Sequence, residues 1–86
     1  MQDKIVVYSA KLCGDCQELK SFLEKNGIQY ENRDIHEDPE HKEILHQKTG
    51  KLGVPYLVIG DEWKRGYDPG KPFSDDFAAS LIGLGI

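Results

Sequence analysis

Two cysteines separated by two residues constrain this chain more than any other feature, in the stretch Lys11-Leu12-Cys13-Gly14-Asp15-Cys16. An apolar run at residues 5–8 precedes them and a helical pattern begins near Gly14, so the pair lies at a turn from a strand to a helix. Unpaired N–H groups and the dipole at a helix N-terminus stabilise a thiolate. A second cysteine within the first turn is close enough to attack a mixed disulfide on the first. The spacing therefore predicts a redox-active dithiol.

Length and charge narrow the class of protein. A chain of 86 residues fits a single domain over residues 1–86, with one modest core. Its 15 acidic and 11 basic residues give a formal charge of −4, which argues against nucleic acid or an anionic membrane surface as the main partner. No apolar run approaches the ~20 residues of a membrane helix, and the first residues enter a strand directly, which leaves no room for a signal peptide. We therefore expect a cytoplasmic protein, in a reducing compartment where a C-x-x-C is more often catalytic or metal-binding than structural.

The hydrophobic pattern predicts strands and helices in the order βαβαββα. Strands are expected at residues 4–8, 28–33, 54–59 and 63–67, and helices at 14–26, at 39–49 and after residue 74. The first helix has one apolar face, made of Cys16, Leu19, Phe22 and Leu23, so Cys16 is expected to point inward and Cys13 to lie exposed at the tip. A strand–helix–strand unit makes the first two strands parallel through a right-handed crossover, with the second strand at a sheet edge.

Small and polar residues mark the ends of these elements. Asn26-Gly27 ends the first helix, Asp38 caps the second and Ser74 caps the third. The second helix starts with Pro39 and stops at Gly50, and Gly60-Asp61 forms a two-residue hairpin turn. Residues 68–72 are predicted to form a loop and residues 83–86 a frayed tail. Three apolar residues in and after the second helix are expected to be buried: Ile44, Leu45 and Leu52.

Three segments in these positions resemble the glutaredoxins and the related NrdH-type redoxins of the thioredoxin superfamily. They are Cys-Gly-Asp-Cys after the first strand, Thr-Gly-Lys-Leu-Gly-Val-Pro at residues 49–55, and residues 63–67. The resemblance covers about residues 4–82. It implies a thioredoxin-like α/β fold, with a four-stranded mixed sheet flanked by three helices. It also implies a cis peptide between Val54 and Pro55, which would bring Val54 backbone groups beside Cys13.

The resemblance implies a small thiol–disulfide oxidoreductase of the glutaredoxin type, which reduces protein disulfides or glutathione mixed disulfides. Cys13 would attack the substrate and Cys16 would resolve the mixed disulfide. Glutathione is expected as co-substrate, without a tightly bound cofactor or a metal, and the protein is expected to be a monomer. The residues expected to bind glutathione or a peptide are Lys11, Leu12, Gly53, Val54, Pro55, Gly66 and Tyr67.

The chain departs from the glutaredoxin pattern between and near its cysteines. Gly14 and Asp15 stand where many glutaredoxins have Pro-Tyr. The negative charge of Asp15 opposes thiolate formation, whereas Lys11 favours it, and at surface exposure the two effects nearly cancel. We therefore expect the pKa of Cys13 to be modestly lowered, mainly by the helix terminus.

A second departure concerns the electron donor. Arg65 stands where glutaredoxins have the first glycine of a Gly-Gly pair, and it could block the γ-glutamyl end of glutathione or pair with its carboxylate. Lys11, Lys42 and Lys51 could hold the other carboxylate. Trp63 and residues 66–69 instead resemble the NrdH-type pattern. Those proteins take electrons from thioredoxin reductase and serve ribonucleotide reductase, which makes both enzymes alternative partners.

Two further alternatives are a non-catalytic thioredoxin-like adaptor and an Fe–S or metal carrier. A zinc site needs about four ligands, and one C-x-x-C supplies two. His36, His41 and His46 recur every five residues, a spacing that does not place them on one helical face. Trp63 is interpreted as a packing residue, while Tyr8 and Tyr56 fit either the core or the rim of a site.

Overall fold

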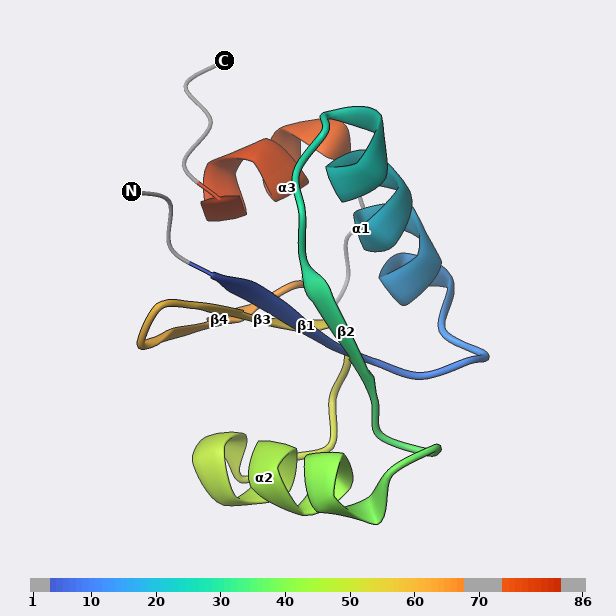
Figure 1. The fold of residues 1–86 in the computed structure, drawn as a ribbon, viewed down its shortest axis with the longest axis vertical. Coiled ribbons are helices and arrows are strands. Elements are labelled where there is room, and N and C mark those ends of the chain that lie inside the picture. Colours follow the sequence, from blue (N-terminus) through green and yellow to red (C-terminus); the bar gives the residue numbers. More distant parts are fainter. Residues whose placement is uncertain (1–3, 68–73, 83–86) are drawn as a thin grey trace.

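The computed structural model describes residues 4–67 and 74–82, which form the predicted order βαβαββα (Figure 1). The expected loop at residues 68–72 and the tail at residues 83–86 lie outside the described residues. The strands and helices are β1 (Ile5–Ser9), α1 (Gly14–Lys25), β2 (Glu31–Asp34), α2 (Pro39–Thr49), β3 (Tyr56–Ile59), β4 (Glu62–Arg65) and α3 (Asp75–Ile82).

The four strands form one mixed sheet in the order β2-β1-β3-β4. β1 runs parallel to β2 and antiparallel to β3, and β4 closes the sheet as the antiparallel partner of β3. This confirms the parallel pairing of the first two strands and the edge position of the second. It also makes β1 and β3 the central pair, with Tyr8 opposite Tyr56 at the end where β1 leaves the sheet.

Three strand boundaries differ from the prediction by two residues or more. β2 begins at Glu31 rather than at residue 28, because the Ile28 N–H donates to the Leu23 carbonyl at 2.9 Å and so still belongs to the end of α1. β3 begins after Pro55, which has no N–H to donate to a strand ladder. β4 ends at Arg65, because Arg65 lies opposite Tyr56, the first residue of its partner strand β3. The next residue, Gly66, donates its N–H to the Pro55 carbonyl at 2.9 Å, in the loop before β3.

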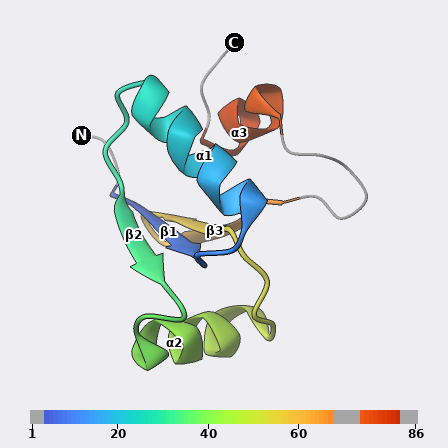
Figure 2. The same cartoon turned by 90° about the vertical axis from the view of Figure 1, so that its right-hand side faces the viewer.

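The helices cover both faces of the sheet. α1 and α3 lie on one face and α2 lies on the other, as the two views in Figures 1 and 2 show. Alternate residues of β1 serve the two cores: Val7 packs with α1 and α3, whereas Val6 and Tyr8 pack on the side of α2. Among residues 4–67 and 74–82, no helix has the length and apolar character needed to cross a membrane.

The predicted helix ends are confirmed. The Asp38 side chain accepts the Glu40 N–H at 2.9 Å and the Ser74 hydroxyl accepts the Phe77 N–H at 3.1 Å. Gly27 and Gly50 follow α1 and α2 with φ of 69° and 74°, a conformation that favours glycine. The expected burial of Leu52 is wrong: this side chain is 42% exposed, because it follows the turn at Gly50 and lies outside the α2 core formed around Leu45.

The aromatic residues of the α2 face form a stack. Tyr8 is only 1% exposed, so it belongs to the core rather than to the rim of a site. Its ring stacks on Trp63 with the ring centroids 5.3 Å apart, and Tyr56 contacts Trp63 from the neighbouring strand at 6.0 Å. The interpretation of Trp63 as a packing residue is confirmed.

Charged side chains fasten the edge strand β2 to β1. Arg33 donates to the Tyr8 hydroxyl at 2.8 Å and pairs with Glu31, and Lys4 pairs with Glu31 at 2.8 Å. Hydrogen bonds from Lys4 and Arg33 lower the pKa of Glu31 to about 2. The Lys4–Glu31 pair joins the starts of the two strands, and the Arg33–Tyr8 hydrogen bond joins them near their ends, before the β2–α2 loop.

Gly66, the residue after β4, lies very close to the loop before β3, and an alanine substitution tests this close approach. A Cβ at this position would lie 2.9 Å from the Pro55 carbonyl oxygen and 3.0 Å from Leu57 Cδ1. We expect Gly66→Ala to lower the free energy of unfolding by about 1–3 kcal/mol, because backbone atoms must move to accept it. Urea unfolding of the oxidised protein measures this change.

Gly14→Ala is the matched control for this prediction. No heavy atom lies within 4 Å of a Cβ at Gly14, and alanine at a helical position is expected to raise the stability by up to about 1 kcal/mol. Equal effects of the two substitutions would contradict the close approach at Gly66.

Candidate active site

Cys13 and Cys16 occupy the start of α1. Cys13 is the N-cap residue, with an extended backbone (φ −111°, ψ 109°), and its Sγ accepts the Cys16 N–H at 3.1 Å. Cys16 has no exposed surface, as its place on the apolar face of α1 predicts, whereas Cys13 is half-buried. The two sulfurs differ in access, and only the first lies where the N–H groups of the helix end can stabilise a negative charge.

The two cysteines form a disulfide, with their Cα atoms 5.2 Å apart. This separation lies within the range found for disulfides, so the turn can close the bond without moving the backbone.

The loop before β3 forms the second wall of the site. The Val54–Pro55 peptide is cis, as expected, and the Val54 carbonyl oxygen lies 3.7 Å from Cys13 Sγ. In the reduced protein the Cys13 thiol could donate to this oxygen. The negative end of the same carbonyl opposes a thiolate, so Val54 works against the Cys16 N–H in setting the pKa of Cys13.

A groove of about 680 Å³ opens beside the sulfur of Cys13; we call it the Cys13 groove. Apolar groups contributed by Ala10, Leu12 and Val54 line much of it. Leu12 is fully exposed, at 102% of its reference surface. The groove thus combines a reactive sulfur with an apolar surface that is open to a ligand.

Lys11, whose positive charge was expected to favour a Cys13 thiolate, forms an ion pair with Glu37 that the sequence did not predict. Lys11 Nζ lies 3.3 Å from a Glu37 carboxylate oxygen. Asp34, at the end of β2, fixes this loop by accepting the N–H groups of His36 at 2.7 Å and Glu37 at 3.1 Å. His36 in turn lines the Cys13 groove. An aspartate directly after a predicted strand, whose side chain can accept backbone N–H groups two and three residues later, is the sequence pattern of such a turn, and it could have identified this loop.

The other expected binding residues gather around the cis peptide. A Cβ at Gly53 would overlap the Tyr67 hydroxyl, so the Tyr67 ring packs directly on the Gly53 backbone. The Gly66 N–H donates to the Pro55 carbonyl and so holds Pro55 against the end of β4. The Arg65 guanidinium lies over the Tyr67 ring, 5.4 Å from its centroid. Residues 53–55 and 65–67 therefore pack together, with Pro55 and Gly66 buried between them.

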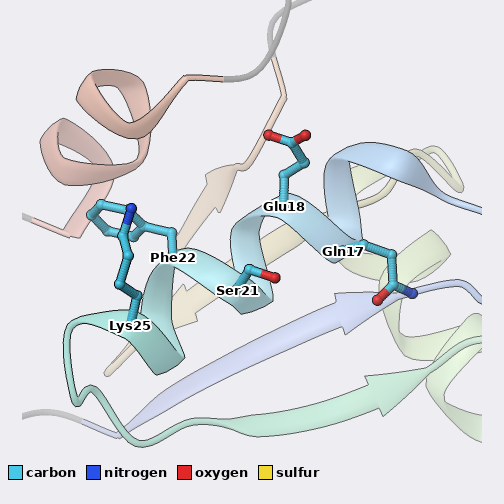
Figure 3. Close-up of a pocket in the computed structure, with 5 residues that line it drawn as sticks. All are labelled: Gln17, Glu18, Ser21, Phe22 and Lys25. Atoms are coloured by element: carbon cyan, nitrogen blue, oxygen red, sulfur yellow. The ribbon is translucent and has the colours of Figure 1, made fainter.

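Two other grooves lie away from the cysteines. Lys42 lines one of about 310 Å³ along α2, together with Leu52, and is not brought to the Cys13 groove. The other, of about 390 Å³, follows the outside of α1, where Phe22 points toward α3 (Figure 3). Within residues 4–67 and 74–82, no three His, Cys, Asp or Glu side chains are grouped to hold a metal ion.

Comparison with known proteins places the chain in a family. The family model described as Glutaredoxin matches residues 5–64. The chain belongs to the glutaredoxin family. The N-acetyl-S-hydroxy-L-cysteine reductase of Bacillus subtilis (strain 168) is 39% identical to this chain over 56 residues, which are 65% of this chain and 60% of that protein. The match therefore spans less than two thirds of the length of this relative.

Solved structures of glutaredoxin-like proteins share the fold. The glutaredoxin-like NrdH-redoxin from Escherichia coli superposes with a TM-score of 0.71 at 26% identity, over 91% of this chain and 93% of its own. A glutaredoxin from Archaeoglobus fulgidus gives a TM-score of 0.69 at 25% identity, over 93% of this chain and 86% of its own. The expected thioredoxin-like fold is thus confirmed.

The surroundings of Cys13 predict how its thiol titrates. We expect a pKa below the ordinary value of about 8.5 for cysteine, because the Cys16 N–H and the α1 terminus stabilise the thiolate. Asp15→Asn should lower this pKa further, since it removes a nearby negative charge. The pH dependence of iodoacetamide alkylation, assigned to Cys13 by mass spectrometry in the reduced protein, measures it.

Lys11→Met is the matched control for Asp15→Asn. It should raise the pKa of Cys13 only slightly, because Lys11 is exposed and already paired with Glu37. A Cys13 pKa at or above that of free cysteine would contradict the role given to the helix terminus.

Proposed function

We propose that this chain is a thiol–disulfide oxidoreductase in which Cys13 is the nucleophile and Cys16 the resolving thiol. The observation that carries the proposal is the asymmetry of the pair: Cys13 Sγ lies at the α1 terminus on an open groove, and Cys16 is buried behind it. The family assignment supports this activity. The whole of residues 1–86 acts as one domain in this proposal.

The reaction is a pair of thiol–disulfide exchanges. The Cys13 thiolate attacks one sulfur of a substrate disulfide, forming a mixed disulfide and releasing the other substrate sulfur as a thiolate that takes a proton from water. The Cys16 thiolate then attacks Cys13 Sγ, which forms the Cys13–Cys16 disulfide and releases the second substrate thiol. The substrate gains two electrons and the dithiol loses two.

The binding residues have distinct roles in this proposal. An extended substrate pairs with the Val54 backbone as a short strand, because the loop before β3 presents it beside Cys13. Gly53, Pro55, Gly66 and Tyr67 hold that loop in place. Lys11 and Leu12 form the opposite rim, on the loop between β1 and α1.

Glutathione is the proposed co-substrate that restores the dithiol, in the cytoplasm, where reduced glutathione is abundant. One glutathione thiolate opens the Cys13–Cys16 disulfide and a second releases glutathione disulfide. A monomer without a bound metal or other cofactor suffices for this cycle, and its partners are glutathione and disulfide-containing proteins.

An NrdH-type cycle is the alternative for the electron donor. Two observations favour it: the likeness to the Escherichia coli NrdH-redoxin, and the position of Arg65 over Tyr67 at the edge of the Val54 loop. In this cycle thioredoxin reductase supplies the electrons and ribonucleotide reductase is a client.

The Bacillus subtilis relative supports a second candidate function, the reduction of a small sulfenic acid. The Cys13 thiolate would attack the sulfenic sulfur, and the hydroxyl group would leave as water after taking a proton. The same Cys16 step would then release the thiol. Supplying a cysteine-derived sulfenic acid in place of the disulfide, in the assays below, separates this function from disulfide reduction.

Serine variants of the two cysteines test the division of roles. Cys13→Ser should abolish all activity, because the nucleophile is lost. Cys16→Ser should keep the reduction of a glutathione mixed disulfide, in which glutathione itself completes the reaction, and lose the reduction of insulin disulfides. The readout is NADPH oxidation coupled through glutathione reductase. Equal loss of both activities in Cys16→Ser would count against these roles.

A paired reductase assay tests the donor. Oxidised protein is supplied with NADPH, glutathione and glutathione reductase, and separately with NADPH and thioredoxin reductase. We expect fast reduction by glutathione. Reduction by thioredoxin reductase alone would favour the NrdH-type cycle, and reduction by neither would favour a non-catalytic adaptor or a cluster carrier. Arg65→Gly is the informative variant, since it should speed the glutathione reaction if the arginine hinders it.

A further inference from the structure

We propose that Leu12 selects the substrate of this site, favouring an extended disulfide peptide with an apolar side chain beside its reactive cysteine. The inference rests on the proposed function, because it concerns what the Cys13 thiolate attacks. It identifies a protein or peptide disulfide with apolar flanking residues as the preferred substrate class.

The exposure of Leu12 is the first observation. Apolar side chains of the core between α1 and the sheet are buried, and Val7, Leu19, Leu23 and Leu57 have no exposed surface. Leu12 is 102% exposed, well above the 42% of Leu52. It immediately precedes Cys13 in the chain, so a disulfide that reaches Cys13 Sγ comes close to it. Covering this side chain removes apolar surface from water, which favours a complex.

The charges around the Cys13 groove are the second observation. Lys11 is the cation next to Leu12, and Glu37 holds it at 3.3 Å. His36 also lines the groove. The whole chain carries a formal charge of −4. An anionic ligand therefore gains little attraction here, whereas an uncharged apolar segment contacts Ala10, Leu12 and Val54.

The third observation is the backbone of Val54, on the side of the groove formed by the loop before β3. The Val54 carbonyl lies 3.7 Å from Cys13 Sγ, and Val54 precedes the first residue of β3. In this proposal an extended segment lies along Val54 with its cysteine at Cys13 Sγ, which brings the residues flanking that cysteine into the groove that Leu12 also lines. A polypeptide is therefore long enough to contact both Leu12 and Val54, whereas a small disulfide contacts only the sulfur of Cys13.

Single-turnover kinetics with three peptide disulfides test the proposal. The symmetric disulfides of Ac-Leu-Cys-Leu-NH2, Ac-Ser-Cys-Ser-NH2 and Ac-Asp-Cys-Asp-NH2 are each mixed with excess reduced protein, and the released thiol is measured. Each rate constant is divided by that of 2-mercaptoethanol with the same peptide, which removes the peptide's own reactivity. We expect the leucine peptide to react about tenfold faster than the serine peptide.

The variants compare the two exposed leucines. Leu12→Ser should bring the leucine-to-serine ratio close to one, while Leu52→Ser, the matched control outside the Cys13 groove, should leave the ratio at its wild-type value. The ratio is taken within each variant, so a general loss of rate does not affect it.

Three results would overturn the inference. They are an unchanged ratio in Leu12→Ser, an equal fall of the ratio in Leu52→Ser, or the fastest reaction with the aspartate peptide, which would instead indicate recognition by Lys11 and His36. Bis(2-hydroxyethyl) disulfide distinguishes the failure of the inference from that of the proposed function. If the wild-type dithiol does not reduce this minimal disulfide, the proposed function fails and the inference with it.

Discussion

The position of one sulfur atom, Cys13 Sγ, depends on the pairing of β1 with β3. Tyr8 pairs with Tyr56, near the end of β1 and at the start of β3, so the loop that follows β1 and the loop that precedes β3 meet at one edge of the sheet. The first loop carries Cys13 and the second carries Val54, whose carbonyl lies 3.7 Å from the sulfur. The site is therefore a product of strand register, and helix α1 adds the Cys16 N–H at 3.1 Å.

Further contacts position the two loops that meet at this point. Gly66 approaches Pro55 so closely that its N–H reaches the Pro55 carbonyl, and Tyr67 covers Gly53. On the opposite side, Asp34 holds the β2–α2 loop, which places Glu37 against Lys11. Neither set of contacts reaches the sulfur itself. Each fixes a loop that does, which is how an exchange reaction that needs aligned sulfur atoms can take place at the surface of a small domain.

The order of the elements, their caps and the dithiol could be predicted from local sequence, because each depends on residues within a few positions of one another. Asp38, Ser74 and Gly27 cap or end helices through neighbouring backbone groups. The Lys11–Glu37 pair and the contact of Tyr67 with Gly53 could not be predicted in this way, since they join residues that only the sheet brings together. Leu52 was misjudged for a related reason: its apolar character suggested burial, but the turn at Gly50 directs the chain away from the α2 core.

Backbone groups and side chains have different roles at this site. Apart from the sulfur of Cys16, the polar groups beside Cys13 Sγ are the Cys16 N–H and the Val54 carbonyl, which the backbone supplies. They act on the sulfur with opposite electrostatic effects, so its reactivity is set by geometry. Leu12 and His36 line the Cys13 groove and Arg65 lies over the Tyr67 ring, so in the proposed reaction these side chains act on the substrate rather than on the sulfur. Substrate choice in this chain is therefore separable from the exchange chemistry, and the rim is where to look for it.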